Sequence, residues 1–485
     1  MAGPVIDVSR LAQLGKDSVV YGLGAVVAKG IGFALLPVFT RIFTPAEFGA
    51  IEMLSTIAAL LSAVLVMGMD SAQSFYFFEQ RDGGRPAQAL VVSAILQWRL
   101  IGGSVVVAVA TLAAPLLNAS FFDGHLTWQH FAAAFVAALF VQVMSQSVEV
   151  FRLLYRPWPY VLVTLAQSLA SAGLVLVLVM VFDQGILGYF VGGLLASIGA
   201  AAVGWYLARD YLRFDALHTV WWPRLLRFGA PLVPAGVAMY VMSTADRWFI
   251  QRYHGEAALG VYAVGAKFAL VMALAIETFR KAWWPIAMDA MHSDDGPQTF
   301  RVIARLFMGV GVAAVVYLAF ASLWLVRWLT PPEYHEGWLV VGVLAWQSLF
   351  YGFYLVASAG IWKAERTHLA MMLMGGAALL NAALNWLLVP SMGGLGAALA
   401  TAVSYLVWIV ASMRVSERLW PVGFPFMLLA IQVAIGAGAV ACVLWLGAQS
   451  WWSIACVHAA VAVLLLSSLY GEGGFLARRP RPTHG

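Results

Sequence analysis

Four basic side chains lie within long apolar stretches of this 485-residue sequence: Lys29, Arg99, Arg247 and Lys267. A charged group at the middle of a membrane-spanning helix costs about 2.5–3.5 kcal/mol, so each needs a partner or a water-filled cavity. Ammonium and guanidinium groups both bind phosphate oxygens, the guanidinium in a bidentate fashion. We therefore expect the four to line a cationic cavity for an anionic ligand. The alternative is that a fixed carboxylate neutralises each lysine and that Arg99 extends to the nearer membrane surface.

Acidic residues in the same stretches are candidates for ion coupling or gating. Asp246 is placed to pair with Lys29 or Lys267, or to take up a proton or cation, and a purely structural lock is the open alternative. Adjacent side chains on a helix point about 100° apart. Asp246 and Arg247 are therefore not expected to be each other's main partner.

Glu52 and Asp70 are predicted to share one face of a single span, about five turns or ~27 Å apart. Ser55, Ala59, Ser62 and Val66 fall on that face, and small, partly polar faces pack or line cavities rather than contact lipid. Both carboxylates are candidates for coupling or gating. For Glu52, a position near the outer membrane surface with no coupling role is the alternative.

Pro231 and Pro234 stand near the start of an apolar stretch predicted at 228–250. Proline inside a helix removes a hydrogen bond and produces a kink. We expect the pair to kink this helix and to contribute to a gate.

These side chains must be positioned by membrane-spanning helices. Hydrophobic residues make up 62% of the chain and charged residues 11%, against about a quarter charged in soluble proteins. The apolar runs are long and do not alternate, which favours helices over a β-barrel. With ~20 residues needed per crossing, the chain is predicted to be an all-α integral membrane protein of about fourteen transmembrane helices. The two cysteines supply neither a disulfide framework nor a metal site.

The distribution of positive charge predicts the orientation of the chain. Most of the 28 Lys and Arg residues fall in the N-terminus and in every second link. Because basic residues concentrate on the cytoplasmic side, both termini are expected in the cytoplasm. The basic residues form no patch suited to nucleic acid. The longest link, 209–227, contains Trp221 and Trp222 and is predicted to lie in the membrane surface.

Three motifs recur in the two halves of the chain at an offset of about 210 residues. Arg156 matches Arg366. The other matches pair Arg41–Gly49 with Arg252–Gly260, and Gly185–Gly188 with Gly393–Gly396.

Each repeat is predicted to hold six spans, so both copies begin on the same side and the local two-fold axis runs along the membrane normal. We predict two six-helix lobes, 1–210 and 211–418, followed by two additional helices and a basic cytoplasmic tail in 419–485.

Several motifs are shared with a known family. They are Leu35-Leu36-Pro37-Val38-Phe39-Thr40-Arg41, Thr44-Pro45-Ala46-Glu47-Phe48-Gly49, Gly229-Ala230-Pro231-Leu232-Val233-Pro234, Asp246-Arg247-Trp248-Phe249-Ile250, Leu259-Gly260-Val261-Tyr262, Ala282-Trp283-Trp284-Pro285 and the run from Asn385 to Thr401. In these residues the chain resembles the polysaccharide-transporter (Wzx-like) flippases of the multidrug/oligosaccharidyl-lipid/polysaccharide (MOP) exporter superfamily.

The resemblance implies two six-helix lobes in the inner membrane of a bacterium that open alternately to each side of this membrane. It also implies, as cargo, an undecaprenyl-pyrophosphate-linked oligosaccharide repeat unit for O-antigen, capsule or exopolysaccharide. Membrane lipids are expected partners, as are a polymerase and a chain-length regulator of the same pathway, and no nucleic acid is expected.

No nucleotide-binding loop or hydrolase motif is present in the sequence, so neither an enzyme nor a bound cofactor or metal is expected. Energy would come from an ion gradient or from the cargo's own concentration difference. Three alternatives stay open: a small-molecule exporter of the same superfamily, an integral-membrane glycan polymerase or ligase, and a scaffold of an export complex.

Overall fold

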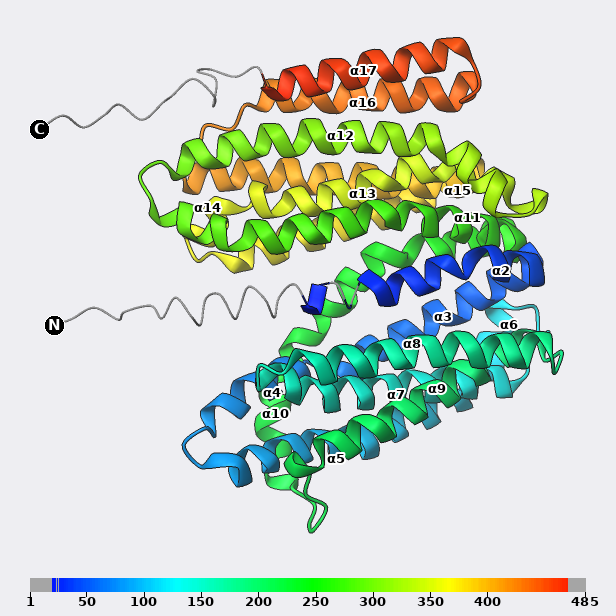
Figure 1. Ribbon diagram of the computed structural model, residues 1–485, viewed down its shortest axis with the longest axis vertical. Coiled ribbons are helices and arrows are strands. Elements are labelled where there is room, and N and C mark those ends of the chain that lie inside the picture. Colours follow the sequence, from blue (N-terminus) through cyan, green and yellow to red (C-terminus); the bar gives the residue numbers. More distant parts are fainter. Residues whose placement is uncertain (1–19, 23, 25, 470–485) are drawn as a thin grey trace, which may run out of the picture. The chain divides into compact units, whose positions relative to one another are not determined.

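The computed structural model describes residues 20–22, 24 and 26–469, and within that range it contains helices and no β-strand. Internal contacts divide the chain into two compact units, Met1–Gly260 and Val261–Gly485. The lobe boundaries at 210 and 418 remain predictions. The helices (Figure 1) are α2 (Leu36–Ile42), α3 (Pro45–Val66), α4 (Met69–Glu79), α5 (Gly84–Leu112), α6 (Ala114–Phe121), α7 (Trp128–Leu153), α8 (Pro157–Met180), α9 (Gly185–Ala208), α10 (Trp222–Gly229), α11 (Val233–His292), α12 (Gly296–Leu329), α13 (Trp338–Ala357), α14 (Ala359–Lys363), α15 (Thr367–Leu419), α16 (Phe426–Leu446) and α17 (Trp451–Leu469).

The described chain has 12 helices that are long and apolar enough to cross a membrane. Two of them, Met239–His292 and Thr367–Leu419, contain 54 and 53 residues, roughly 80 Å each at 1.5 Å per residue. They are broken at Gly255 and Gly393, whose φ angles are 77° and 55°. Counted as two crossings each, they bring the total to fourteen, and the predicted fold class is confirmed.

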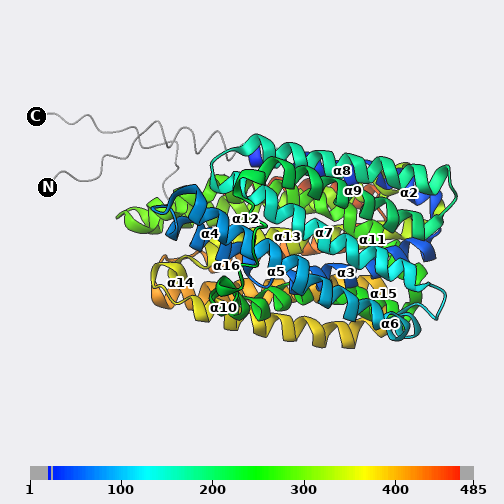
Figure 2. The same cartoon turned by 90° about the horizontal axis from the view of Figure 1, so that it is seen from below.

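In the first unit α7 packs against α3, α5, α8 and α9 (Figures 1 and 2). Close approach of α8 and α9 depends on small residues, since a Cβ atom at Gly192 would lie 2.7 Å from the backbone nitrogen of Val175. In the second unit α12 packs against α13, α16 and α17. Gly309 of α12 approaches α17 so closely that its Cβ atom would lie 1.7 Å from the Ser468 hydroxyl.

The sequence repeat is reproduced in the backbone. Arg156 precedes α8 and Arg366 precedes α15, and the residue before each, Tyr155 or Glu365, has a left-handed φ of 55° or 57°. Left-handed backbone is uncommon for residues other than glycine, so its recurrence at matched positions supports a true duplication.

A second repeated feature is the turn into the last span of each copy. Gly185 opens α9 with a φ of 50°, and its match Gly393 breaks α15 with a φ of 55°. Glycine adopts this conformation without the steric penalty of a Cβ atom. Both copies therefore reverse direction by the same device.

The single span predicted to carry Glu52 and Asp70 is not one continuous helix. α3 ends at Val66, Met67 and Gly68 are left-handed, and α4 begins at Met69. The prediction that Glu52 and Asp70 share one helix face is therefore wrong. The break is fixed by packing, because a Cβ atom at Gly68 would lie 2.4 Å from the carbonyl oxygen of Gly229.

The proline pair lies where α10 leads into α11, in the stretch predicted at 228–250. Pro231 lies in a short 3-10 turn, Ala230–Leu232, and Pro234 is the second residue of α11. In the first turn a proline leaves no intrahelical hydrogen bond unmade. Helical backbone thus passes from α10 into α11 through a 3-10 turn at the prolines, and the predicted kink and gating role remain predictions.

The link between α9 and α11 contains the short helix α10 and is hydrogen-bonded to α5. Trp222 Nε1 donates to the Ala94 carbonyl at 3.1 Å, and the backbone N–H of His218 donates to Gln97 Oε1 at 2.8 Å. Leu225 of α10 is fully buried. The segment thus anchors the exit of the first repeat beside α5.

Candidate functional site

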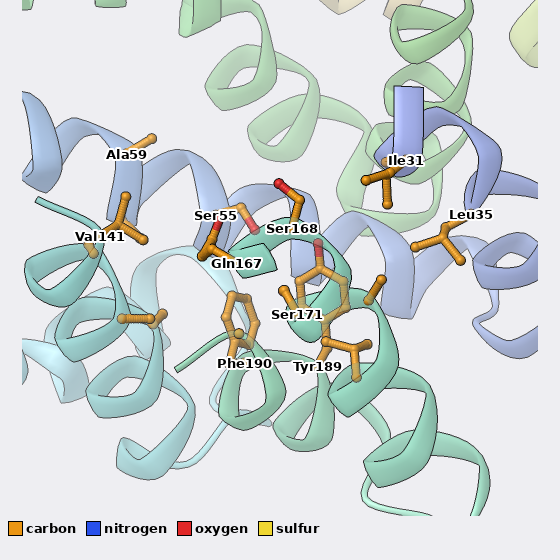
Figure 3. A pocket seen from close by; sticks show the side chains of 18 of the residues that line it. Ile31, Leu35, Ser55, Ala59, Val141, Gln167, Ser168, Ser171, Tyr189 and Phe190 are labelled. Atoms are coloured by element: carbon orange, nitrogen blue, oxygen red, sulfur yellow. The ribbon is translucent and has the colours of Figure 1, made fainter. Parts of the chain in front are cut away.

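A cavity of about 470 Å³ lies inside the first unit (Figure 3). None of its lining side chains, within the described part of the chain, is charged. They are mostly small and come from the first span and α2 (Ala28, Ile31, Gly32, Leu35, Phe39), α3 (Ser55, Ala58, Ala59, Ser62), α7 (Ala134, Ala137, Ala138, Val141), α8 (Gln167, Ser168, Ser171, Ala172, Val175) and α9 (Tyr189, Phe190, Gly193).

A polar stripe on α8 faces this cavity. Gln167, Ser168 and Ser171 line it (Figure 3), and Thr164 precedes them at a helical spacing. The Ser168 hydroxyl donates to the Thr164 carbonyl at 3.0 Å. The opposite side of the helix is apolar, with Leu169 59% exposed. A polar face on a membrane helix belongs against protein or water.

The small, partly polar face predicted around Ser55 and Ser62 lies on α3 and also lines the cavity. Ser55, Ala59 and Ser62 of α3 contribute to its wall, as their small, partly polar character indicated. Ser62 Oγ accepts a hydrogen bond from Gln142 Nε2 of α7 at 2.5 Å. The prediction of a packing or cavity face is confirmed for these three residues.

Three residues of the predicted site form one ionic cluster. Arg247 Nε lies 3.1 Å from Glu52 Oε1, and Arg247 Nη1 lies 3.1 Å from Asp246 Oδ1. The three side chains are between 6% and 16% exposed. Asp246 Oδ1 also accepts from the backbone N–H of Arg247 at 2.9 Å. Asp246 and Arg247 do form an ion pair, because the short carboxylate turns toward the next residue's N–H and the long guanidinium bends back. Arg247 lies equally close to Glu52, so the expectation that Asp246 and Arg247 are not each other's main partner stays a prediction.

This cluster joins the two sequence repeats. Glu52 belongs to α3 of the first copy, and Arg247 belongs to the first half of α11, which precedes the second Arg-to-Gly motif. Tyr240, which precedes Arg247 in the same helix, donates from its hydroxyl to the Thr56 carbonyl at 2.7 Å. Charge and hydrogen bonding therefore fasten α11 to α3.

Beyond the cluster the matched motifs contact each other directly. A Cβ atom at Gly49 would lie 1.9 Å from the carbonyl oxygen of Glu256, and one at Gly260 would lie 1.9 Å from that of Pro45. Pro45 and Glu256 are themselves matched by the repeat, as are the two glycines. The contact is self-complementary, as a two-fold axis requires.

Arg99 is buried and paired, not free. Its side chain is 1% exposed, and its guanidinium contacts Asp70 Oδ1 and the Gln142 carbonyl oxygen. Arg99 does not extend to the membrane surface, so that alternative is wrong. The pair connects α4, α5 and α7 and acts as a tie between helices.

The two lysines lie in different compact units. Lys29, in the first unit, is exposed and forms no ion pair with another described residue. Lys267 of α11 is half-buried in the second unit. A cationic cavity shared by Lys29 and Lys267 stays a prediction.

Sequence reasoning missed the residues that complete the cavity, namely Gln167, Ser168, Ser171 and Gly193. A signal for three of them was available, since Thr164, Gln167, Ser168 and Ser171 recur at one face of an otherwise apolar helix. Their position opposite Ser55 depends on tertiary packing.

Comparisons with known proteins agree on the class of the chain. A family described as "Polysaccharide biosynthesis protein" matches residues 14–291. "Lsg locus putative protein 1" of Haemophilus influenzae is 25% identical over 289 residues, 57% of this chain and 66% of that protein. An "uncharacterized membrane protein" of the same organism is 21% identical over 281 residues, 57% of this chain and 65% of that one. The chain thus covers just under two thirds of these relatives.

Solved structures with a similar fold are membrane transporters. "Lipid II flippase MurJ, inward closed conformation" has a TM-score of 0.72 at 14% identity, covering 93% of this chain and 98% of that one. An outward-facing multidrug resistance MATE transporter of the MOP superfamily has a TM-score of 0.60 at 14% identity, covering 84% and 96%. At this identity the likeness concerns the fold.

Proposed function

This chain belongs to the polysaccharide biosynthesis family, and on that premise we propose that it is a flippase for lipid-linked saccharides. Its cargo would be an undecaprenyl-pyrophosphate-linked oligosaccharide repeat unit. The chain would move this unit from the cytoplasmic to the outer leaflet of the bacterial inner membrane for O-antigen, capsule or exopolysaccharide synthesis. A polymerase and a chain-length regulator of that pathway would act on the product.

The observation that supports transport by alternating access is the self-complementary contact of Gly49 and Gly260 with the opposite repeat. Two like-oriented repeats that meet about an axis along the membrane normal can separate at one end and close at the other. The contact consists of backbone and small residues, so its separation exposes little apolar surface. Under the proposed orientation it lies at the outer end.

A second close backbone contact lies just beyond the C-terminal end of α3. Gly68 and Gly229 approach so closely that a Cβ atom at Gly229 would lie 2.3 Å from the Met67 carbonyl oxygen. α3 and residues 229–260 are therefore in contact at both ends. Under the proposal these two contacts would open in turn, and each opening would give the cargo access from one side.

The ionic cluster offers a means of coupling to a proton gradient. If the outer contact opens, Arg247 of α11 must leave Glu52 of α3, whose side chain is 14% exposed. Breaking a buried ion pair costs about 3–5 kcal/mol. Protonation of Glu52 or Asp246 would lower that cost, so we propose these carboxylates as coupling residues.

Lys29 and Lys267 are proposed to bind the diphosphate of the cargo as point charges. The alternative of a small-cation exporter would require carboxylates in the substrate cavity, and the cavity of the first unit has none among its lining residues.

The proposal is tested in cells by removing the gene from its native bacterium. Lipid-linked repeat units should accumulate on the cytoplasmic leaflet and be inaccessible to a non-permeant glycan-labelling reagent in intact cells. Re-expression should restore labelling. Unchanged labelling in the deletion strain, with no second flippase gene in it, would contradict the proposal.

A further inference from the structure

We propose that the cavity of the first unit binds the neutral saccharide portion of the cargo. The proposal rests on the flippase function and identifies where the glycan lies. It is carried by the chemistry of the cavity wall and by a comparison between the two repeats.

The cavity wall is uncharged and contains polar side chains that form no hydrogen bond with another described residue. Ser55, Gln167 and Ser171 form no hydrogen bond with another described residue. An amide supplies two donors and an acceptor, and each hydroxyl supplies one donor and two acceptors. Sugar hydroxyls are complementary to such groups. The absence of charge in this lining excludes the diphosphate from the cavity, so it suits the uncharged part of the cargo.

Aromatic rings and size also match a glycan. Phe39 and Tyr189 are partly exposed and line the cavity, with ring centroids 5.8 Å apart in an edge-to-face arrangement. Rings of this kind offer apolar surface to the C–H faces of sugars. The volume of about 470 Å³ falls within the roughly 300–1,000 Å³ typical of small-molecule sites.

The second repeat fills the corresponding place. At the repeat offset, Ser171 matches Asn381 and Gly193 matches Thr401. Asn381 Nδ2 donates to Thr401 Oγ1 at 3.4 Å, and both residues are buried. In the first repeat the two smaller residues leave space, since a Cβ atom at Gly193 would lie 3.9 Å from Ser171 Oγ. The fold therefore does not require this cavity.

A hydrocarbon chain is a poorer occupant than a sugar. Covering unpartnered hydroxyl and amide groups with apolar atoms costs about 1–3 kcal/mol per group. The second unit shows what an apolar cavity in this protein looks like. That cavity has about 320 Å³ and is lined by Met272, Ala275, Ile276, Phe279, Ile303, Leu306, Phe307, Val310, Gly311 and Ala314.

The position of Lys29 fits a cargo that spans two subsites. Lys29 lies on the same helical turn as Ala28 and Gly32, which line the cavity, and it is itself exposed. A diphosphate held by Lys29 would place the attached sugars next to the cavity. One molecule would thus use the lysine for its charge and the cavity for its glycan.

The test fills the cavity with the side chains of the second repeat, in the double variant Ser171→Asn/Gly193→Thr. The matched control is Gly199→Thr on the same helix α9, where a Cβ atom meets nothing within 4 Å. Purified proteins in proteoliposomes are assayed for translocation of the lipid-linked repeat unit. We expect the double variant to translocate at less than a tenth of the wild-type rate and the control to match wild type.

A second variant, Gln167→Leu, removes the amide proposed to hydrogen-bond with the sugar but does not fill the cavity. We expect a loss of roughly tenfold in translocation, and an increase would indicate a hydrocarbon occupant and overturn the proposal. Wild-type rates in both variants would also overturn it while leaving the flippase function intact. If wild-type protein itself translocates nothing, the flippase function fails, so the two failures are distinguishable.

Discussion

Gly49 and Gly260 occupy matched positions in the two repeats, and a Cβ atom at either would lie 1.9 Å from a carbonyl oxygen of the opposite motif, that of Glu256 or Pro45. Two backbones approach this closely only where both positions lack a side chain. The two repeats therefore meet here through a close backbone contact that both glycines make possible. Under the proposed mechanism, alternating access requires this contact to open and close.

Replacing Gly49 with Ala should weaken the contact and impair transport. The new Cβ atom would lie 1.9 Å from the Glu256 carbonyl oxygen, and overpacking costs about 1–3 kcal/mol. We expect a lower melting temperature in detergent and loss of most translocation. Gly173→Ala is the control, because a Cβ atom there meets nothing within 4 Å. Equal behaviour of the two variants would contradict the role of the contact.

Arg247→Gln should destabilise the protein by about 3–5 kcal/mol, because it removes the buried guanidinium that lies 3.1 Å from both Glu52 and Asp246. Glu52→Gln removes one charge of the cluster and should cost less. The double variant should be more stable than Arg247→Gln alone. Thermal unfolding of the four proteins measures the coupling, and strictly additive changes would show that the pair contributes nothing.

Lys29→Ala and Lys267→Ala should each abolish complementation of a flippase-deficient strain at normal protein levels, since the diphosphate loses a counter-charge. Lys281→Ala is the control, because Lys281 is exposed and lies 3.8 Å from Glu277 in an i,i+4 pair. Full complementation by both test variants would remove the lysines from the site.

Arg99→Leu should lower the amount of folded protein without altering cargo selectivity. It would leave Asp70 without the cation that joins α4, α5 and α7. The double variant Asp70→Asn/Arg99→Leu should regain part of the folded protein. Fluorescence-detected size-exclusion profiles, compared with translocation per folded molecule, would separate this structural role from cargo binding. A normal profile with a reduced specific rate would favour a binding role instead.

Much of the fold could be predicted because it depends on local patterns. Apolar runs set the fourteen crossings, and the repeated residues at Arg156 and Arg366 mark turns with the same backbone geometry. The small, polar face with Ser55 and Ser62 also signalled a cavity. These features are properties of single helices or turns.

What was missed depends on contacts between distant segments. The break at Met67 and Gly68 lies within a continuous apolar run and is set by the approach of Gly229. The pairing of Asp246 with Arg247 depends on side-chain rotamers, which helix geometry alone does not fix. The polar residues of α8 line a cavity because Gly193 in the neighbouring helix α9 leaves space beside them, and this packing is not visible in the sequence of either helix.

Translocation by purified protein is the most direct measurement of the central claim. Proteoliposomes containing undecaprenyl-pyrophosphate-linked repeat units on the inner leaflet are probed with a glycan-modifying enzyme added outside. The account predicts that wild-type protein exposes the inner pool and that a Gly49→Ala vesicle does not. Exposure at the same rate in protein-free vesicles, or none with wild-type protein in either orientation and with an imposed proton gradient, would contradict it.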